Sequence, residues 1–340
     1  MVCGMFYEIK KALKRQYNLD INDAQIYMNG KPGSFIIYSD KVKYVLKSLN
    51  NELNLQQVIN IKKACSAVKN YGIKTPQFID TNMGIPYFYL ENNKYVLYLW
   101  IDGQILEYNK VSIKQLFELA DKFANVVSAL STLPKEQKKQ GYMWNVNMLK
   151  RHIIEAETIK KKLSDYEMLA ILEWKIAEMN RLCNYSNNYL NNMTWANSHG
   201  DYYISQALFD ELGKMTGLID FDSFSCQPLA YELIRCFYSA LPFETDEKQM
   251  KILAKYLFTF AKRIPLTYED FYYMHYLFSY KIITSLYWFV IFLENPLNQT
   301  IKKEAIKYSN LAMQILKNQQ ILREGIWEFL KDRMKSIGEY

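Results

Sequence analysis

The segment 197–222 constrains the fold of this chain more than any other stretch. It contains two short apolar runs, 206–209 and 215–221, on either side of a polar turn at 210–214 that includes a glycine. Strand-sized runs separated by a short glycine-containing turn are typical of a β-hairpin. The segment therefore predicts an antiparallel hairpin in the middle of the chain.

The register of this hairpin determines which side chains meet at its open end. Pairing of Asp210 with Met215 places Gln206 opposite Ile219, one residue before Asp220. Directly opposed residues of an antiparallel pair lie about 5 Å apart. Gln206 and Asp220 are therefore expected to converge at the open end.

Asp201, in the loop that leads into the hairpin, adds a second carboxylate to this group. Two carboxylates and an amide oxygen at a strand end can hold a hard cation such as Mg²⁺ and orient a hydroxyl group. The alternative is a plain turn followed by an ordinary strand end.

The same residues carry a family resemblance. His199-Gly-Asp201, followed by Gln206 and then by Ile219-Asp-Phe-Asp222, resembles the catalytic and metal-binding segments of the aminoglycoside phosphotransferase and choline kinase superfamily. These are small-molecule kinases with a protein-kinase-like fold. The family pattern is H-G-D-x-x-x-x-N, so Gln206 stands where the family has asparagine. His-Gly-Asp alone would favour a plain turn, and Ile-Asp-Phe alone would favour an ordinary strand end. The two tripeptides joined by a hairpin favour the kinase-like fold.

The resemblance implies a role for each matching residue. Asp201 and His199 would be catalytic, and Asp220 and Gln206 would be metal ligands. The implied cofactors are ATP and Mg²⁺, and the implied acceptor is an unidentified hydroxyl compound. Glutamine is one methylene longer than asparagine, which puts the strict geometry of a Mg²⁺ site at risk.

The sequence of the N-terminal part, up to residue 99, predicts one leading helix followed by strands. Apolar spacing predicts a helix at 6–17, and β-rich runs predict strands. The predicted strands lie at 24–28, 34–39, 43–49, 77–79, 86–90 and 95–99. The third run contains Tyr44-Val-Leu-Lys47, which resembles the V-A-I-K motif of kinases. The resemblance implies that Lys47 binds nucleotide phosphates, against the alternative of a solvated strand lysine.

Two further features of this part bear on nucleotide binding. Gly30 and Gly33 lie in the first hairpin turn and would let the backbone approach phosphates, or they form a plain β-turn. A helix is predicted at 55–71, where the kinase fold places a glutamate that holds the strand lysine. This helix has none, since the nearest one, Glu52, precedes it. Lys47 would then be held by a neutral amide, or its ion pair would be missing.

The pattern changes from strands to long helices after Gly103, which predicts an α+β, two-lobed fold. We expect an N-lobe at 1–98 with a small antiparallel sheet, a hinge at 99–103 and a larger helical C-lobe at 104–340 that carries the catalytic hairpin. Helices are predicted at 112–133, 149–163, 166–184, 228–237, 248–263, 268–294, 302–317 and 324–337.

The hinge also carries a resemblance. In the family the hinge backbone receives the adenine ring, which implies that Tyr98, Leu99 and Trp100 contact the nucleotide. The run 95–103 is similar to the hinge of the CotS-type spore coat members, as is the pair Tyr202-Tyr203. This subgroup implies a mother-cell cytoplasmic protein that is deposited on the spore coat and has other coat proteins as partners.

Glu232, in the first turn of the helix predicted at 228–237, has two interpretations. Family members place an acidic residue here, where its carboxylate can brace the catalytic loop. A glutamate in a first helical turn is also favoured by the helix dipole alone.

Composition narrows the classes of function. The net charge of +7 comes from 42 basic and 35 acidic residues that are scattered along the chain, so we expect no nucleic-acid partner. Five cysteines without a CxxC pair, and only three histidines, argue against a disulfide scaffold or a zinc site.

Met1–Lys10 lacks the apolar core of a signal peptide. The most apolar run, 282–293, is shorter than the roughly 20 residues that span a bilayer. We therefore expect a protein that is not secreted and has no membrane partner.

Three functions remain open at this point. The first, which we favour from the resemblance, is a spore-coat-associated kinase-like protein with ATP- and Mg²⁺-dependent phosphoryl transfer to a hydroxyl group. The second is a spore-coat protein with the kinase fold that works by association, with weak or no catalysis, and the missing helix glutamate and Gln206 favour it. The third is a choline- or aminoglycoside-type kinase. A +7 chain without an acidic cluster in its C-lobe argues weakly against a polycationic acceptor.

Overall fold

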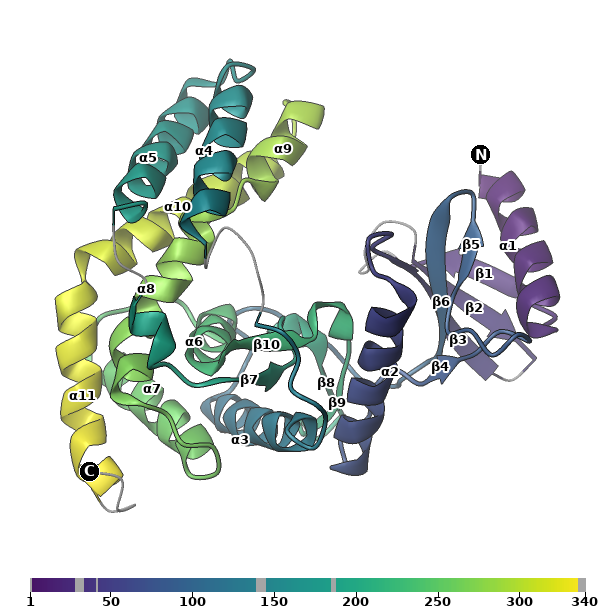
Figure 1. The fold of residues 1–340 in the computed structure, drawn as a ribbon, viewed down its shortest axis with the longest axis horizontal. Coiled ribbons are helices and arrows are strands. Elements are labelled where there is room, and N and C mark those ends of the chain that lie inside the picture. Colours follow the sequence, from purple (N-terminus) through teal and green to yellow (C-terminus); the bar gives the residue numbers. More distant parts are fainter. Residues whose placement is uncertain (1, 28–33, 41, 139–144, 185–187, 336–340) are drawn as a thin grey trace.

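The computed structural model describes residues 2–27, 34–40, 42–138, 145–184 and 188–335, and the statements below concern these residues. Gly30 and Gly33 lie outside them. The chain forms a small lobe built on a sheet and a larger lobe built of helices (Figure 1). The predicted two-lobed α+β architecture is confirmed.

The small lobe is an antiparallel sheet in the order β1-β2-β3-β6-β4, with β5 also paired to β6. The strands are β1 (Asp23–Ile26), β2 (Phe35–Ser39), β3 (Val42–Leu49), β4 (Phe78–Ile79), β5 (Phe88–Leu90) and β6 (Asn93–Leu99). Alternate side chains of β2, such as Ile37, point into an apolar core that is closed by Ile9 and Leu13 of helix α1 (Val2–Tyr17). Helix α2 (Leu55–Asn70) lies between the two lobes (Figure 1).

Local sequence explains where α2 begins. Asn54 accepts a hydrogen bond from the backbone N–H of Gln57, and the side chain of Gln57 accepts one from the N–H of Asn54. This capping box satisfies two backbone donors that the first helical turn leaves without intrahelical partners. The buried face of α2, which includes Ile61 and Val68, packs on α3 of the larger lobe.

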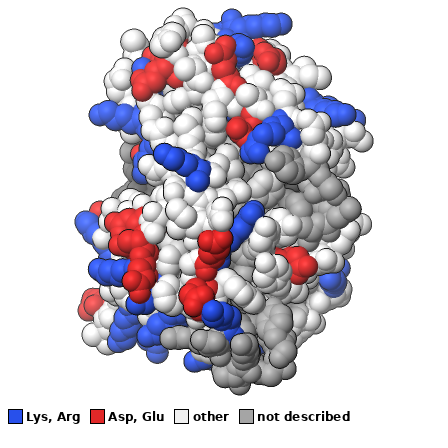
Figure 2. Space-filling model, turned by 90° about the vertical axis from the view of Figure 1, so that its left-hand side faces the viewer, with Lys and Arg blue, Asp and Glu red and all other residues white. Residues whose placement is uncertain are grey.

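The larger lobe contains the helices α3 (Ile113–Leu130), α4 (Val146–Lys160), α5 (Tyr166–Leu182), α6 (Leu229–Ala240), α7 (Glu247–Ala261), α8 (Tyr268–Thr284), α9 (Tyr287–Glu294), α10 (Gln299–Lys317) and α11 (Gln319–Lys335). Helix α6 lies in the middle of the core, and ten of its residues are buried. Figure 2 shows lysine and arginine interspersed with aspartate and glutamate on one side of the molecule. Mixing of this kind is typical of a solvated surface.

The predicted hairpin consists of β8 (Ala207–Phe209) and β9 (Met215–Leu218). Its open end has the predicted register, because Ala207 pairs with Leu218 and the N–H of Ile219 donates to the carbonyl of Gln206 at 2.9 Å. Toward the turn the register shifts by one residue at a bulge. Phe209 therefore pairs with Met215, and the predicted pair of Asp210 with Met215 is wrong.

A second two-stranded sheet supports the segment that carries the His-Gly-Asp motif and was not expected from the sequence. Strand β7 (Trp195–Ser198) runs into the loop at His199, and β10 (Ser225–Pro228) pairs with it after the hairpin. Three short 3₁₀ turns complete this region, namely η1 (Asn188–Asn191), η2 (Ile204–Gln206) and η3 (Phe221–Ser223).

The segment after β6 is tied to the hairpin. Gln104 and Phe209 exchange two backbone hydrogen bonds of 2.8 Å, and Lys74 bonds through its backbone to Thr216 and Leu218. The hairpin is therefore held both by the segment that follows β6 and by the connection between α2 and β4. The domain boundaries at 98 and 104 remain a prediction.

The helix predicted over 268–294 is wrong as a single element, because it breaks at Ser285–Leu286 into α8 and α9. Side chains from neighbouring helices satisfy the carbonyl groups at the break. Lys175 donates to the carbonyls of Ile282 and Ser285 at 2.8 and 2.9 Å, and His152 contacts the carbonyl of Thr284. These contacts supply partners that a continuing helix would otherwise have to provide.

The stretch Tyr268–Glu294 is the one part of the described chain that is long and apolar enough to cross a membrane. More than half of its most apolar window, 56%, is buried inside the helical lobe. Together with the break, this burial identifies α8 as a core helix, whereas α9 buries only Phe289 and Phe292.

Lys175 is buried, and burial lowers its pKa to about 7. The two carbonyl partners favour the charged form and limit this shift. Between pH 7 and 10.5 the unfolded chain therefore binds more protons at this position than the folded one, so its contribution to stability rises with pH. We expect the free energy of unfolding to increase, relative to Lys175→Met, by roughly 1–3 kcal/mol from pH 7 to pH 10.

Urea denaturation of both proteins at several pH values measures this difference. Lys150→Met, at an exposed position of α4, is the matched control and should leave the pH profile of the wild type unchanged. A constant difference between wild type and Lys175→Met across the range would contradict the argument.

Candidate active site

A buried carboxylate holds the loop that carries the predicted catalytic residues. Glu232, on α6, accepts hydrogen bonds from the backbone N–H of Gly200 at 3.1 and 3.0 Å and from that of Tyr202 at 3.2 Å. Burial raises the pKa of Glu232, and the hydrogen bonds partly oppose that effect. Of its two interpretations, the structure supports the brace of the loop.

Gly200 is required by the same loop. Its φ of +84° lies in the left-handed region, and a Cβ at this position would collide with the carbonyl oxygen of Ser223. Only glycine adopts this backbone conformation without strain and allows such a close approach. The glycine of the His-Gly-Asp motif thus brings the loop against η3, next to Asp220.

Both ring nitrogens of His199 contact backbone groups. Nε2 lies 2.9 Å from the carbonyl oxygen of Ile219, and Nδ1 accepts from the N–H of Asp201 at 3.2 Å. The side chain is fully buried and packs against Phe221. These contacts connect the loop to the end of β9, which favours a positioning role over the predicted catalytic one.

Asp201 is a quarter exposed, and its carboxylate forms an ion pair with Arg235 of α6. The guanidinium group of Arg235 also lies over the ring of Tyr203, 4.5 Å from its centroid. Arg235 therefore fixes the carboxylate and the following part of the loop together. No sequence motif points to Arg235, although it lies three residues after Glu232 on the same helix.

Lys47 joins the two lobes. Its ammonium nitrogen lies 2.8 Å from an oxygen of Asp220 and 2.8 Å from an oxygen of Asp222. All three side chains are largely buried, with exposed fractions of 11%, 19% and 8%. Burial by itself lowers the pKa of Lys47, but the carboxylates of Asp222 and Asp220 outweigh it and raise the pKa. The lysine is therefore charged at neutral pH.

This geometry answers the question of the missing helix glutamate. Helix α2 has no acidic residue, and it packs on η3, which contains Asp222. Lys47 is therefore neither held by a neutral amide nor left without an ion pair. The hairpin segment supplies its second carboxylate, that of Asp222. Asp222 belongs to the Ile-Asp-Phe-Asp motif, but the sequence pattern alone assigns it no role.

Asp220 adopts a left-handed backbone conformation, with φ 63° and ψ 59°. Residues other than glycine rarely occupy this region, and such strain tends to occur at functional sites. Gln206 lies across the hairpin end and is 7% exposed. Its amide nitrogen donates to the hydroxyl of Tyr203 at 3.2 Å, and its amide oxygen is the atom that a metal would take.

The donor set here fits Mg²⁺, which prefers oxygen ligands and commonly binds through one or two carboxylates together with substrate phosphates. The described residues contain no group of three or more histidine, cysteine, aspartate or glutamate side chains that could hold a metal on its own. Asp220 and Gln206 are the residues that would hold Mg²⁺ by the family resemblance, and this assignment remains a prediction. Asp222 adds a carboxylate nearby.

The three predicted hinge residues differ in which of their groups could contact a nucleotide. Tyr98 is buried, and its ring packs edge-on against Phe78. The N–H groups of Leu99 and Trp100 donate to the carbonyls of Gln77 and Lys43 at 3.1 and 3.0 Å. Contact of this backbone with adenine remains a prediction, and carbonyl groups are what Leu99 and Trp100 could offer it.

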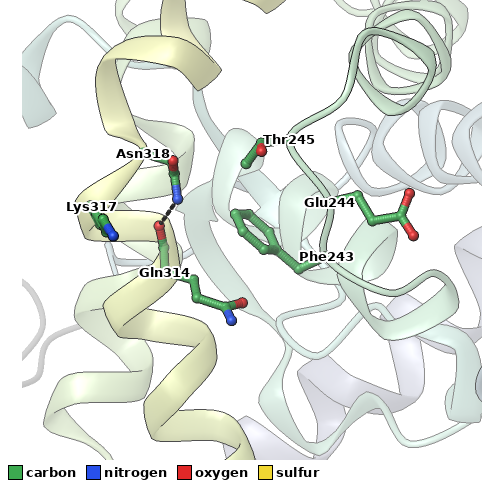
Figure 3. Close-up of a pocket in the computed structure, with 6 residues that line it drawn as sticks. All are labelled: Phe243, Glu244, Thr245, Gln314, Lys317 and Asn318. Carbon is green, nitrogen blue, oxygen red and sulfur yellow. Dashed lines mark hydrogen bonds between the residues drawn. The ribbon is translucent and has the colours of Figure 1, made fainter.

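An open cavity of about 330 Å³ lies elsewhere, between the α6–α7 connection and the end of α10 (Figure 3). Its lining residues are Phe243, Glu244, Thr245, Gln314, Lys317 and Asn318. None of the predicted site residues borders it.

Comparison with known proteins agrees with this geometry. No curated protein sequence matches the chain. An aminoglycoside phosphotransferase from Alicyclobacillus acidocaldarius superposes with a TM-score of 0.59 at 14% identity, over 96% of each chain. An amicoumacin kinase, solved with AMP-PNP and Ca²⁺, gives 0.63 at 11% identity, over 90% of this chain and 92% of that one.

A microcompartment-associated aminopropanol kinase gives 0.60 at 12% identity, over 92% of this chain and 98% of that one. At these identities the likeness shows the fold alone, and it is the predicted kinase-like fold. The family described as "Phosphotransferase enzyme family" matches residues 33–266, a span that includes Lys47, the loop at Asp201 and the hairpin. The protein belongs to this phosphotransferase family.

Proposed function

We propose that the protein transfers the γ-phosphoryl group of ATP to a hydroxyl group of a small molecule. The observation that carries the proposal is the ion-paired group of Lys47, Asp220 and Asp222, which lies at the junction of the lobes beside the loop of Asp201. The solved structures of nucleotide-bound kinases with the same fold support it.

Each residue then has a role in the transfer. Lys47 would neutralise phosphate charge. Asp220 and Gln206 would hold Mg²⁺, which would supply positive charge against the phosphates and the charge that develops on them. Arg235 contacts one oxygen of Asp201, and the other oxygen orients the acceptor hydroxyl and takes its proton. The new bond joins the acceptor oxygen to the γ-phosphorus while the bond to the β-phosphate oxygen breaks and ADP leaves. His199 and Glu232 position the loop.

A catalytically inactive, association-only protein is the alternative, and one of its supports has changed. The missing glutamate on α2 no longer counts for it, because Asp222 supplies a carboxylate to Lys47 at 2.8 Å. Gln206 at the metal position remains in its favour.

Nucleotide binding tests the proposal. Wild type should bind ATP more tightly with Mg²⁺ than without it, in a calorimetric titration. Lys47→Met keeps the stem and removes the charge, and it should weaken ATP binding at least tenfold. Asp220→Asn should remove the Mg²⁺ dependence. Lys63→Met, at an exposed position of α2, is the control. Equal affinity of Lys47→Met and wild type would refute the role of Lys47.

Asp222→Asn tests the pairing that replaces the helix glutamate. The change leaves Lys47 with one carboxylate in a buried site, so we expect a loss of about 1–3 kcal/mol in the free energy of unfolding and weaker ATP binding. Glu52→Gln, the acidic residue before α2, should behave as wild type in both urea denaturation and titration. A larger loss in Glu52→Gln than in Asp222→Asn would show that Glu52 holds the lysine.

We further propose, as the narrower assignment, that the protein is CotS-type, made in the mother-cell cytoplasm and deposited on the spore coat. The run 95–103 and the pair Tyr202-Tyr203 support it by resemblance. Immunodetection of the protein in coat extracts of purified spores is the expected result. Its recovery in mother-cell lysate alone would exclude coat deposition and leave the phosphotransferase proposal unaffected.

A further inference from the structure

Gln206 stands where the family pattern has asparagine, at the position that the resemblance assigns to a metal ligand. Its side chain is buried, and its backbone lies next to Asp220 in space, because the N–H of Ile219 donates to the carbonyl of Gln206 at 2.9 Å. An amide binds a hard cation through its oxygen, since its nitrogen is a hydrogen-bond donor. The orientation of the amide group therefore decides whether Gln206 can act as a ligand.

Tyr203 contacts the nitrogen end of this amide. Its hydroxyl accepts a hydrogen bond from Nε2 of Gln206 at 3.2 Å, and its carbonyl accepts one from the backbone N–H of Gln206 at 3.0 Å. Among the residues that the structure describes, no hydrogen-bond donor contacts the amide oxygen of Gln206. The two contacts across η2 thus engage the nitrogen and leave the oxygen for a cation.

The ring of Tyr203 is itself held in place. The guanidinium carbon of Arg235 lies 4.5 Å from the ring centroid, and the same guanidinium group forms the ion pair with Asp201. A cation within about 6 Å of a ring centroid attracts the ring. Arg235 therefore fixes the ring that carries the hydroxyl, and the hydroxyl in turn fixes the amide of Gln206.

A hydrogen bond to the amide nitrogen matters more for glutamine than for asparagine. Glutamine has one more rotatable bond, and the last torsion of its amide is broad and roughly two-fold. Without a partner for the nitrogen, the two ends of the amide could exchange places at little cost. Plain packing of Tyr203 against Arg235 is the alternative role, and it would need the ring alone. The hydroxyl separates the two roles, because it is the group that contacts the amide.

We propose that Tyr203 is a positioning residue for the metal site, where its hydroxyl holds the amide of Gln206 with the oxygen free for Mg²⁺ and so offsets the extra methylene. The proposal rests on the phosphotransferase function and on Mg²⁺ as its cofactor. Arg235 contacts both the ring of Tyr203 and the carboxylate of Asp201. The amide ligand and the carboxylate that orients the acceptor hydroxyl therefore share one support.

Binding of a non-hydrolysable ATP analogue measures this role without turnover. Calorimetric titrations are made in Mg²⁺ and in EDTA, and thermal unfolding confirms that each variant is folded. Tyr203→Phe removes the hydroxyl and keeps the ring that Arg235 covers. It should weaken binding in Mg²⁺ about three- to tenfold, as expected for the loss of one hydrogen bond. Its affinity in EDTA should match that of the wild type, because the hydroxyl acts through the metal ligand.

A double-mutant cycle identifies Gln206 as the partner. Gln206→Asn restores the shorter side chain of the family pattern, which does not depend on the hydroxyl of Tyr203. In this background Tyr203→Phe should have no further effect on binding in Mg²⁺, since the two residues act on one interaction. Tyr268→Phe is the matched control, because it removes a hydroxyl from a partly exposed tyrosine of α8 whose ring packs on Trp327. It should bind the analogue as the wild type does.

The outcomes separate this proposal from the one it rests on. A wild type that binds more tightly with Mg²⁺, and a Tyr203→Phe variant that does so to the same extent, overturn the positioning role and leave phosphoryl transfer standing. An equal loss in Mg²⁺ and EDTA, or an equal loss in both backgrounds of the cycle, has the same consequence. A wild type that binds equally with and without Mg²⁺ overturns the metal site and the role of Tyr203 with it. A wild type that does not bind the analogue overturns the phosphotransferase function itself.

Discussion

The contact of Lys47 with Asp220 and Asp222 is the constraint on which the functional geometry depends, because it joins β3 of the small lobe to the segment that follows β9. Its value is not mainly stability. Taking charges out of water costs several kcal/mol for each ion, and a buried pair recovers this only with good geometry. The contact mainly fixes the geometry, because one lysine with two carboxylate partners holds the hairpin end in place relative to the sheet. Without it, the lobes would be held by the backbone ties of Lys74 and Gln104 and by the packing of α2.

The catalytic loop is positioned by a different kind of interaction. Glu232 accepts from two backbone N–H groups, and His199 bonds the backbone at Ile219 and Asp201. Each of these groups is buried, so loss of a partner would leave an unsatisfied polar atom away from water, which costs about 1–3 kcal/mol. The loop therefore has a single favourable arrangement. Asp201 is the member of the motif that remains partly exposed, and it can contact a substrate.

Short-range pattern predicted the elements of this site well and their long-range partners poorly. Alternation and apolar spacing predicted β8, β9 and their register at the open end, because a one-residue slip there would turn every side chain to the opposite face. The bulge before the turn has no comparable signal. The break between α8 and α9 depends on Lys175, more than a hundred residues away, so the apolar run 282–293 looked like one helix. The ion pairs of Asp222 and Arg235 could not be predicted for the same reason, because their partners Lys47 and Asp201 lie far away in sequence.

The ion pair between Asp201 and Arg235 is compatible with the proposed phosphoryl transfer. An arginine on the catalytic carboxylate would hinder a reaction that requires early removal of a proton. Phosphoryl transfer through a loose transition state requires little of this, because the acceptor oxygen attacks late and the work lies in positioning and charge stabilisation. Arg235 holds Asp201 at a fixed orientation and also lies over the ring of Tyr203, so the carboxylate and the following part of the loop are fixed together. One guanidinium group thus fixes both the carboxylate that would orient the hydroxyl and the aromatic ring beside it.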